Sequence, residues 1–198
     1  MARQLRMVRP NLNDLPKLEL PSGYHLRTYR EGDEIHWANI ISDSFGGRRR
    51  TAQDTQNEIT NRDVFVPHGL YFITHQDIPI ATACAWRQSV DETDVGYVHM
   101  VGVIGEHTGM RLGKWVSLAV LFYFKENGFT CSMLDTDDFR LPAIKTYLNL
   151  GFIPVYVDDT QTKRWKDIFQ TLKLQPMTSQ ITQVQNLLPA DLWVKVSR

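Results

Sequence analysis

The segment best suited to bind an anion lies where a strand is expected to run into a long helix. It reads Gly105-Glu-His-Thr-Gly109-Met-Arg-Leu-Gly113-Lys114. A helix N-terminus exposes unpaired backbone N–H groups, and its dipole favours negative charge. Arg111 and Lys114 add positive charge there, so a pyrophosphate would gain charge-assisted hydrogen bonds. The alternative interpretation is that Gly109 and Gly113 simply permit a tight strand-to-helix turn.

Two well-known phosphate motifs are excluded by the spacing. The segment is neither a Walker A loop nor a G-x-G-x-x-G fingerprint, which disfavours nucleoside triphosphates and NAD as ligands. The chain carries 22 basic and 22 acidic residues, so any anion site must be built locally. The balance of charge also predicts no nucleic-acid partner and no attachment to an anionic membrane.

The elements that position this segment follow from hydrophobic spacing and from turn residues. In the first half we expect a strand at 24–29, a helix with Asp33 as its N-cap, and a second helix from the capping box Thr51/Asp54 to about residue 61. The basic run Arg48–Arg50 between these helices is interpreted as a solvated loop.

The second half alternates strands and helices. A hairpin is expected at 70–74 and 80–86, then a strand at 97–104, a helix at 110–127 that ends at Gly128, a strand at 130–134, a helix at 142–150 closed by Gly151, and a strand at 152–157. This order predicts an α/β (α+β) fold with a mixed sheet and helices on both faces. A further helix is indicated by Trp165, Ile168, Phe169 and Leu172, and 175–198 has no clear pattern.

Length and composition favour a single domain. The 198 residues, 42% of them hydrophobic, are enough for one substantial core. We divide the domain into an extended N-terminal arm (1–23), a core (24–157) and a C-terminal extension (158–198). Cys84 and Cys131 lie in apolar stretches and are expected to be buried and unpaired, which favours the cytoplasm. The longest apolar run, 115–124, is too short to span a membrane, and no secretory signal is recognisable.

Two motifs in order resemble those of the GNAT superfamily of acetyltransferases. The string Val101-Gly-Val103-Ile-Gly105-Glu-His-Thr-Gly109-Met-Arg-Leu-Gly113 resembles the superfamily's acetyl-CoA signature, a V-x-V strand end followed by P-E-x-R-G-x-G/R-x-G. About thirty residues later, Ala143-Ile-Lys-Thr-Tyr147-Leu-Asn-Leu-Gly151-Phe152 is similar to A-x-x-x-Y-x-x-x-G-F. The resemblance covers roughly 24–157. Thr108 replaces the usual loop arginine, Arg111 the central glycine, and Gly105 the proline before the loop.

The resemblance implies a mostly antiparallel GNAT-like sheet with a splayed strand pair and acetyl-CoA bound at the splay. In such folds free backbone amides of the V-x-V strand hold the pantetheine and polarise the thioester carbonyl. The residues that the resemblance assigns to acetyl-CoA are Val101, Gly102, Val103, Thr108, Gly109, Met110, Arg111, Leu112, Gly113, Lys114, Arg140 and Ala143. Arg140 stands where an asparagine is frequent, and it is expected to reach a phosphate or the adenosine end.

The same resemblance implies direct attack of an amine on the thioester. Tyr147 matches the tyrosine that gives a proton to the departing thiolate, although packing in the core is the rival interpretation. Strict alternation along a strand places Tyr97, His99, Val101 and Val103 on one face, where relatives often keep a glutamate. His99 is therefore the candidate base, with a buried structural histidine as its rival.

The acceptor is not encoded in any motif. Asp135, Asp137 and Asp138 are expected to attract a cationic amine or to cap the helix of Tyr147, with capping preferred for at least one. Nothing suggests a metal site. Three functions stay open: transfer of acetyl to an amine of a small molecule or protein, a non-catalytic acyl-CoA sensor, and transfer of a longer acyl chain. The apolar residues at 165–172 and Leu187, Leu188, Leu192 and Trp193 suggest a homodimer.

Overall fold

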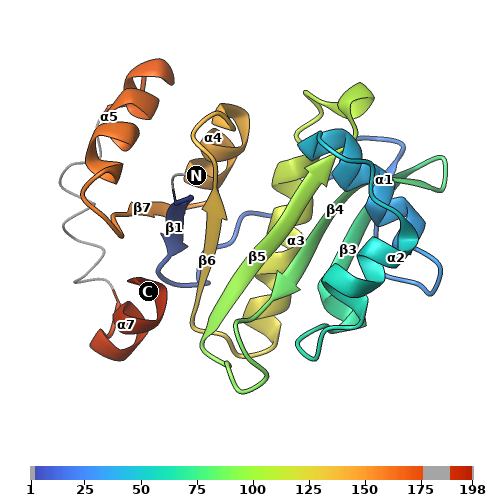
Figure 1. Cartoon of the computed structure of the whole chain (residues 1–198), viewed down its shortest axis with the longest axis horizontal. Coiled ribbons are helices and arrows are strands. Elements are labelled where there is room, and N and C mark those ends of the chain that lie inside the picture. Colours follow the sequence, from blue (N-terminus) through green and yellow to red (C-terminus); the bar gives the residue numbers. More distant parts are fainter. Residues whose placement is uncertain (1–2, 176–187, 198) are drawn as a thin grey trace.

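A seven-stranded sheet organises the computed structural model, which describes residues 3–175 and 188–197 (Figure 1). The strands are β1 (Leu5–Arg9), β2 (Tyr24–Thr28), β3 (Leu70–His75), β4 (Ile78–Trp86), β5 (Val95–Val103), β6 (Cys131–Thr136) and β7 (Ile153–Val155), in the order β2-β3-β4-β5-β6-β1-β7. Every pairing is antiparallel except that of β5 with β6. The predicted mixed, mostly antiparallel sheet is confirmed.

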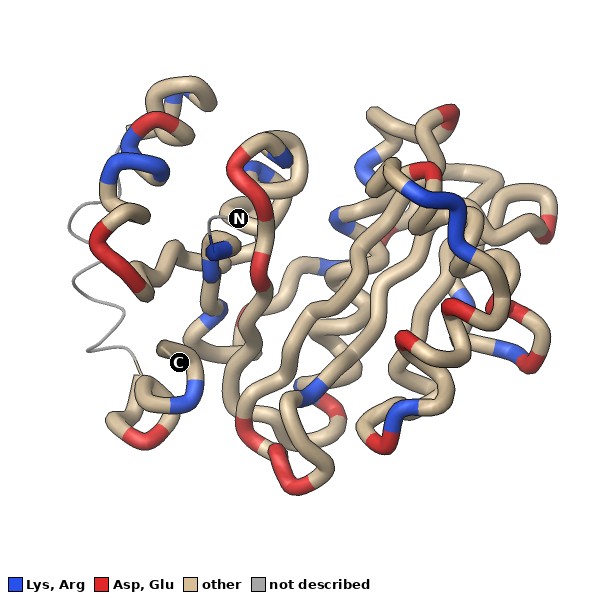
Figure 2. The backbone as a smooth tube through the Cα atoms, viewed as in Figure 1, with Lys and Arg blue, Asp and Glu red and all other residues tan. Residues whose placement is uncertain are grey.

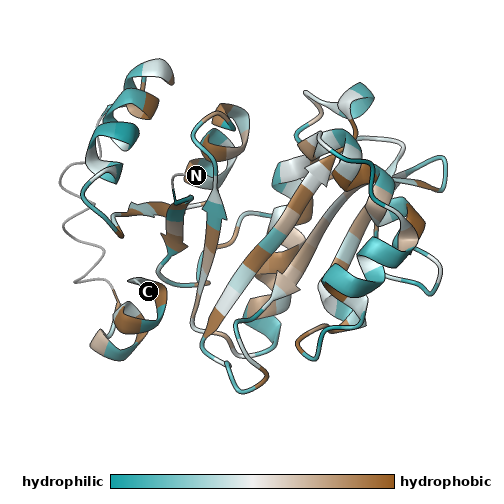
Figure 3. Ribbon diagram, in the orientation of Figure 1, coloured by the Kyte–Doolittle hydropathy of each residue, from teal (hydrophilic) through white to brown (hydrophobic). Residues whose placement is uncertain are grey.

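Helices cover both faces, as predicted. The helices α3 (Leu112–Glu126), α4 (Leu141–Asn149) and α5 (Gln161–Thr171) share one apolar core with Met7, Ala83 and Leu134 of the sheet. On the opposite face α1 (Glu34–Phe45) packs on Phe72 and Cys84, and α7 (Ala190–Ser197) packs on Val8 and Met133. In Figure 3 the central strands β4 and β5 are mostly white to brown, whereas α2 (Ala52–Thr55) and α5 show more of the hydrophilic teal.

The first helical pair differs in detail from the expectation. Asp33 precedes α1, but its carboxylate accepts from Arg27 Nη1 at 2.6 Å and from the Arg30 amide at 2.7 Å instead of capping the helix. The capping box of Thr51 and Asp54 is confirmed at α2 (Ala52–Thr55), which continues as a π-helix over Gln56–Thr60. The basic run between the helices, visible in blue in Figure 2, is not simply solvated, because Arg48 pairs with Asp54 and Arg50 with Glu58.

The expected N-terminal arm is a strand inside the sheet. β1 lies between β6 and β7 and pairs antiparallel with both, with Met7 opposite Leu134 and Pro154. Leu5, Met7 and Val8 are fully buried. The arm is extended as predicted, but it is part of the sheet and not an appendage on the domain. Prolines and scattered apolar residues do not reveal a strand whose partners lie more than a hundred residues away.

β5 and β6 separate from each other along their length. They pair only through Val95–Tyr97 against Cys131–Met133, so the rest of β5 has no strand partner on its β6 side (Figure 1). The opposite edge of β5 continues along β4, with Val103 opposite Ala81. The splayed strand pair implied by the resemblance is therefore present.

The C-terminal extension packs on the chain itself. Trp165, Ile168 and Phe169 of α5 are buried in the main core, and Leu188 and the α7 residue Leu192 are buried in the smaller core that includes Val8 and Met133. Leu187 lies outside the described residues. Most of the described side chains that suggested a homodimer are therefore used within the monomer, and dimerisation stays an untested prediction. Both cysteines are buried and free, as expected. None of the described helices is long and apolar enough to cross a membrane.

Candidate active site at the splay

The loop between β5 and α3 presents consecutive unused backbone donors. Among the described residues no hydrogen bond is made by the amides of Gly109, Met110, Arg111, Leu112 or Gly113, whereas those of Thr108 and Lys114 on either side are bonded. These five amides lead directly into α3, a helix of 15 residues. Free amides at a helix N-terminus form an anion-binding nest. The loop thus has the free donors that the predicted pyrophosphate cradle needs, and its binding of a pyrophosphate stays a prediction.

The start of the same loop is fixed by the end of α1. The Gly105 amide donates to Asp43 Oδ2 at 2.6 Å. Ser44 Oγ donates to the Val103 carbonyl and accepts from the Val103 amide, both at 2.7 Å. The Val103 amide was expected to be free for a ligand, and this expectation is wrong because a serine from α1 occupies it. Val101 is half-buried on the stretch of β5 that has no strand partner on its β6 side.

Thr108 has a structural role in the loop. Its hydroxyl donates to the Gly105 carbonyl at 2.8 Å, and its amide donates to the same oxygen at 3.1 Å. Both donors close the short 3-10 turn Gly105–His107, so the expectation that they face a ligand is not met. Next to this turn, the Tyr24 hydroxyl and His107 Nδ1 are hydrogen-bonded at 3.0 Å, which joins the loop to β2. His107 therefore contacts a tyrosine of the sheet.

The backbone conformation of Arg111 explains why the GNAT signature has a glycine at this position. Its φ is +59°, in the left-handed region that residues with a Cβ avoid. Its side chain is exposed and close to the free amides. Lys114 is half-buried, and its Nζ lies 4.4 Å from the centre of the Trp115 ring. Both cations remain beside the cradle as predicted, and Arg111 adds its charge at the cost of backbone strain.

Arg140 bridges the two sides of the splay. It precedes α4, and its guanidinium lies 4.0 Å from the ring centre of Phe45, the last residue of α1. Its Nε also donates to Asp137 at 3.3 Å. Arg140 thus contacts a ring and a carboxylate, and its expected contact with a phosphate or the adenosine end stays a prediction. Ala143 lies one turn further on α4, half-buried against the main core.

A β-bulge in β5 overturns the expected alternation of side chains. His99 is opposite Cys84 and Gly102 is opposite Thr82, so two residues of β5 face one residue of β4, and Met100 has φ +51°. The extra residue shifts the phase, which places Tyr97 and His99 on the α1 face and Val103 on the α3 face. Gly102 also faces α1, where an added Cβ would lie 3.0 Å from Ile41 Cδ1. The four side chains predicted to share a face therefore do not.

His99 is packed between two aromatic rings. Its ring centre lies 5.1 Å from Trp86 and 5.5 Å from Tyr97. Burial lowers the pKa of His99 to about 4. The imidazole is consequently neutral at pH 7, so it can accept a proton, but it is a weak base.

The low pKa of His99 makes stability depend on pH. Between pH 6.5 and about 4 the unfolded chain binds a proton at this site while the folded chain does not, so the free energy of unfolding should fall as the pH falls. The fall should reach roughly 3 kcal/mol. Urea unfolding of His99→Gln should show a correspondingly smaller loss between pH 7 and pH 4. His25→Gln, at an exposed position, is the control, and an unchanged slope in His99→Gln would contradict the argument.

Tyr147 is the most enclosed of the predicted site residues that carry a titratable group. It is 7% exposed, and its ring meets Phe152 edge-on at 6.0 Å. Burial raises the pKa of Tyr147 to about 12, with the charge of Arg140 acting in the opposite direction. The phenol therefore keeps its proton throughout the physiological range. It lies in the main core, so the packing interpretation is correct for its ring, and the role of its hydroxyl stays a prediction.

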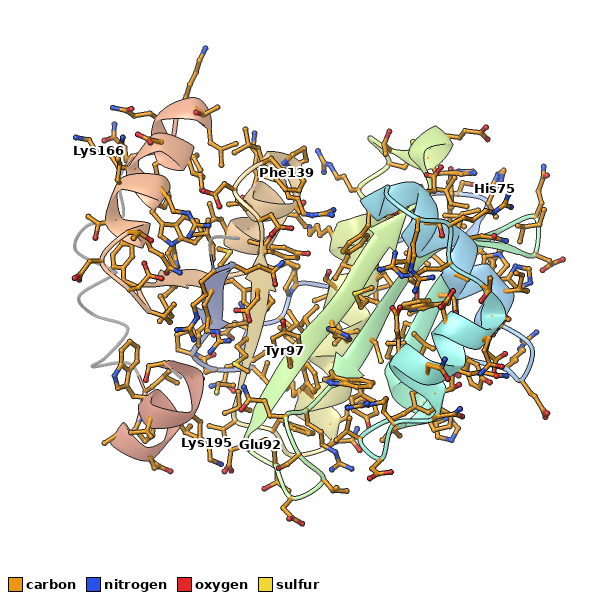
Figure 4. All side chains as sticks on the ribbon, viewed as in Figure 1. His75, Glu92, Tyr97, Phe139, Lys166 and Lys195 are labelled. Atoms are coloured by element: carbon orange, nitrogen blue, oxygen red, sulfur yellow. The ribbon has the colours of Figure 1, made fainter. Side chains whose placement is uncertain are left out.

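Sequence reasoning missed a polar group where β5 and β6 begin to separate. Arg6 of β1 makes a two-pronged ion pair with Asp135 of β6, both bonds 2.8 Å, and also donates to the Val196 carbonyl of α7. Burial, followed by the Asp135 carboxylate, raises the pKa of Tyr97 on the neighbouring strand. Figure 4 shows Tyr97 between β5 and β6. The alternating pattern of the strand predicts that Tyr97 lies on one of its faces. No signal in the sequence predicts that Arg6 lies next to the point where β5 and β6 separate.

The three aspartates after β6 form ion pairs and do not cap α4. Asp135 pairs with Arg6, Asp137 with Arg140 and Asp138 with Arg164. No side chain caps the N-terminus of α4. The preference for capping was therefore wrong, because arginines take these carboxylates, two of them distant in sequence and one three residues away. Among the described residues no group of three or more potential metal ligands occurs.

Known proteins resemble this chain over most of its described length. The model of the acetyltransferase (GNAT) family matches residues 35–152. Mycothiol acetyltransferase of Nocardia farcinica is 31% identical over 166 residues, which cover 79% of this chain and 55% of that protein. The enzyme of the same name from Thermobispora bispora is 29% identical over 160 residues, 77% of this chain and 54% of that protein. The chain spans about half the length of these curated relatives.

Solved structures show the same fold at low sequence identity. A GCN5-related N-acetyltransferase from Sphaerobacter thermophilus superposes with a TM-score of 0.60 at 18% identity, over 77% of this chain and 49% of that one. The ribosomal-protein-S18-alanine N-acetyltransferase from Escherichia coli gives 0.54 at 14% identity, over 66% and 77%. The family match over 35–152, the splayed strands and the unbonded amides before α3 agree, and the chain belongs to the acetyltransferase (GNAT) family.

Proposed function

We propose that this protein transfers the acetyl group of acetyl-CoA to an amine. The five unbonded amides at Gly109–Gly113, in line with the open edge of β5, are the observation that carries the proposal. These amides offer donors for a pyrophosphate at one end of the open edge of β5. An extended pantetheine can lie along the backbone of this edge, toward the bulge at Met100. Arg111 and Lys114 supply the positive charge.

The proposed chemistry needs one proton acceptor and one proton donor. Backbone N–H groups at the bulge of β5, where its register with β4 shifts, stabilise the negative charge that develops on the thioester oxygen. Tyr147, with its pKa of about 12, gives a proton to the departing thiolate. His99 accepts a proton from the attacking nitrogen, and because burial holds its pKa near 4 it does so only after attack has made that nitrogen acidic. We also propose a cytoplasmic location, supported by the two free cysteines.

Titration with acetyl-CoA tests the cradle directly. The variant in which Arg111 and Lys114 are both alanine should bind acetyl-CoA about tenfold more weakly or worse, because two cations beside the pyrophosphate are lost. Isothermal titration of wild type and variant measures this. Lys166 is exposed on α5, and Lys166→Ala should leave the affinity unchanged.

A glycine variant separates charge from backbone strain at Arg111. Arg111→Gly removes the same charge but suits φ +59°, so it should weaken acetyl-CoA binding while raising the free energy of unfolding by about 1 kcal/mol relative to Arg111→Ala. No detectable binding of acetyl-CoA to the wild-type protein would refute the proposed function. Binding without acetylation of any amine in a broad panel would indicate a sensor of the same fold.

A further inference from the structure

Ser44, in the last turn of α1, occupies both backbone groups of Val103. Its Oγ donates to the Val103 carbonyl and accepts from the Val103 amide, each at 2.7 Å. These bonds join the end of α1 to the end of β5, which lie side by side in Figure 1. The hydroxyl thus takes the place of a neighbouring strand, because it satisfies one donor and one acceptor of the same residue.

The bonds of Ser44 lie on the open edge of β5. The amide of Ile104 donates to the carbonyl of Ile80, on the β4 side, at 2.9 Å. Consecutive residues of a strand direct their backbone groups to alternate sides, so those of Val103 point away from β4. That is the side from which β6 has separated, since β6 pairs with β5 only at Val95–Tyr97. Ser44 therefore fills a position on the edge that the proposed function gives to pantetheine.

A pantetheine arm that lies along this edge must pass Val103. Val103 stands between the unbonded amides at Gly109–Gly113 and the bulge at Met100, the two ends of the proposed path. Pantetheine contains two amides, each with one N–H and one C=O, so an extended arm can bond to a strand edge as another strand does. The Ser44 hydroxyl and a pantetheine carbonyl would then compete for the Val103 amide, which has a single hydrogen to donate.

We propose that Ser44 holds the place of a pantetheine amide in the free enzyme and turns away when acetyl-CoA binds, so that this serine sets the affinity for the cofactor. The displaced hydroxyl has another acceptor within its own helix, the carbonyl four residues earlier. Ser42 already bonds in this way, because its Oγ donates to the Ala38 carbonyl at 2.7 Å. The inference rests on the proposed function, since the competing group belongs to acetyl-CoA.

Isothermal titration with acetyl-CoA tests the competition. Ser44→Ala removes the competitor and leaves the Val103 amide to water, so it should bind acetyl-CoA about tenfold more tightly than wild type does. ADP carries the pyrophosphate without the pantetheine arm, and its affinity should stay within twofold. Ser42→Ala is the matched control, because Ser42 Oγ also donates one bond and accepts one, from the Arg50 amide at 2.8 Å, with neither partner in β5. Its affinity for acetyl-CoA should be that of wild type.

Unfolding with and without ligand adds a readout that a purely structural serine would not give. In the free protein Ser44→Ala and Ser42→Ala each lose two hydrogen bonds, and both should unfold at a lower urea concentration than wild type. At saturating acetyl-CoA the deficit of Ser44→Ala should disappear, because wild type has then given up the same bonds, whereas the deficit of Ser42→Ala should remain.

Hydrogen exchange at the Val103 amide, followed by NMR, reports on the exchange of partners itself. This amide should exchange faster in free Ser44→Ala than in free wild type, since its acceptor has been removed. Once acetyl-CoA is bound, the amide should be equally protected in both proteins.

The outcomes separate this inference from the proposed function. Weaker or unchanged binding of acetyl-CoA by Ser44→Ala, an equal gain for ADP, or a loss of stability that persists at saturating ligand would each overturn the role of Ser44 and leave a protein that binds acetyl-CoA. Failure of both wild type and Ser44→Ala to bind acetyl-CoA would instead refute the proposed function, and the role of Ser44 with it.

Discussion

Replacing Tyr147 with phenylalanine is expected to lower kcat about 100-fold or more, within the range that general acid catalysis contributes. The hydroxyl is the only group removed, and the ring should keep its packing against Phe152. Because burial raises the pKa of Tyr147 to about 12, the wild-type enzyme should show no loss of kcat from this group up to about pH 11. Steady-state rates with saturating acetyl-CoA, followed by release of free thiol, measure both effects.

The control for this change is another partly buried phenol. Tyr71 of β3 is half-buried against the same core, and Tyr71→Phe should leave kcat within about twofold. Affinity for acetyl-CoA should be nearly unchanged in Tyr147→Phe, since the cradle is built from the β5–α3 loop. If Tyr147→Phe kept the wild-type kcat, the hydroxyl would have no part in proton transfer and the residue would be a packing tyrosine.

Loss of Arg6 should be the most destabilising single change at the splay. Arg6→Ala would leave the Asp135 carboxylate beside Tyr97 without its ion-pair partner, and it would remove the donor to the Val196 carbonyl. Side chains of this pair are 10% and 18% exposed, so the pair is close to buried. Breaking such a pair costs about 3 kcal/mol or slightly more. Urea unfolding at pH 7 measures the loss.

A more exposed ion pair of similar geometry provides the comparison. Arg164 also donates hydrogen bonds from two nitrogens to its aspartate, Asp138, but the Asp138 side chain is 43% exposed. Arg164→Ala should therefore cost about 1 kcal/mol or less. Equal losses for the two variants would show that burial does not set the strength of the Arg6 pair.

Local signals in the sequence were sufficient for most of the fold and for the cradle. The hairpin of β3 and β4, the helix ending at Gly128 and the helix closed by Gly151 all depend on residues adjacent in sequence, and each was predicted within a few residues. The cradle belongs to the same class, because free amides are a property of any loop that enters a helix. The family then followed from two motifs at the correct spacing.

The predictions that were wrong depend on contacts between residues distant in sequence or on an irregularity in a strand, and no local sequence pattern indicates these. One extra residue near Met100 reverses the alternation of β5, so His99 and Val103 face opposite sides. The Val103 amide is taken by Ser44 from another element, and Asp135 by Arg6 from the far end of the chain.

The place of β1 in the sheet has a consequence for how the chain folds during synthesis. Arg6 and Asp135 are separated by 129 residues, so β1 leaves the ribosome long before the strand that it pairs with. Until β6 has been synthesised, β1 has both edges unpaired and its apolar side chains exposed to solvent, which favours incorrect association with other strands. Folding should accordingly contain a late step, the closure of β1 between β6 and β7, with the slow rate that such distant contacts impose.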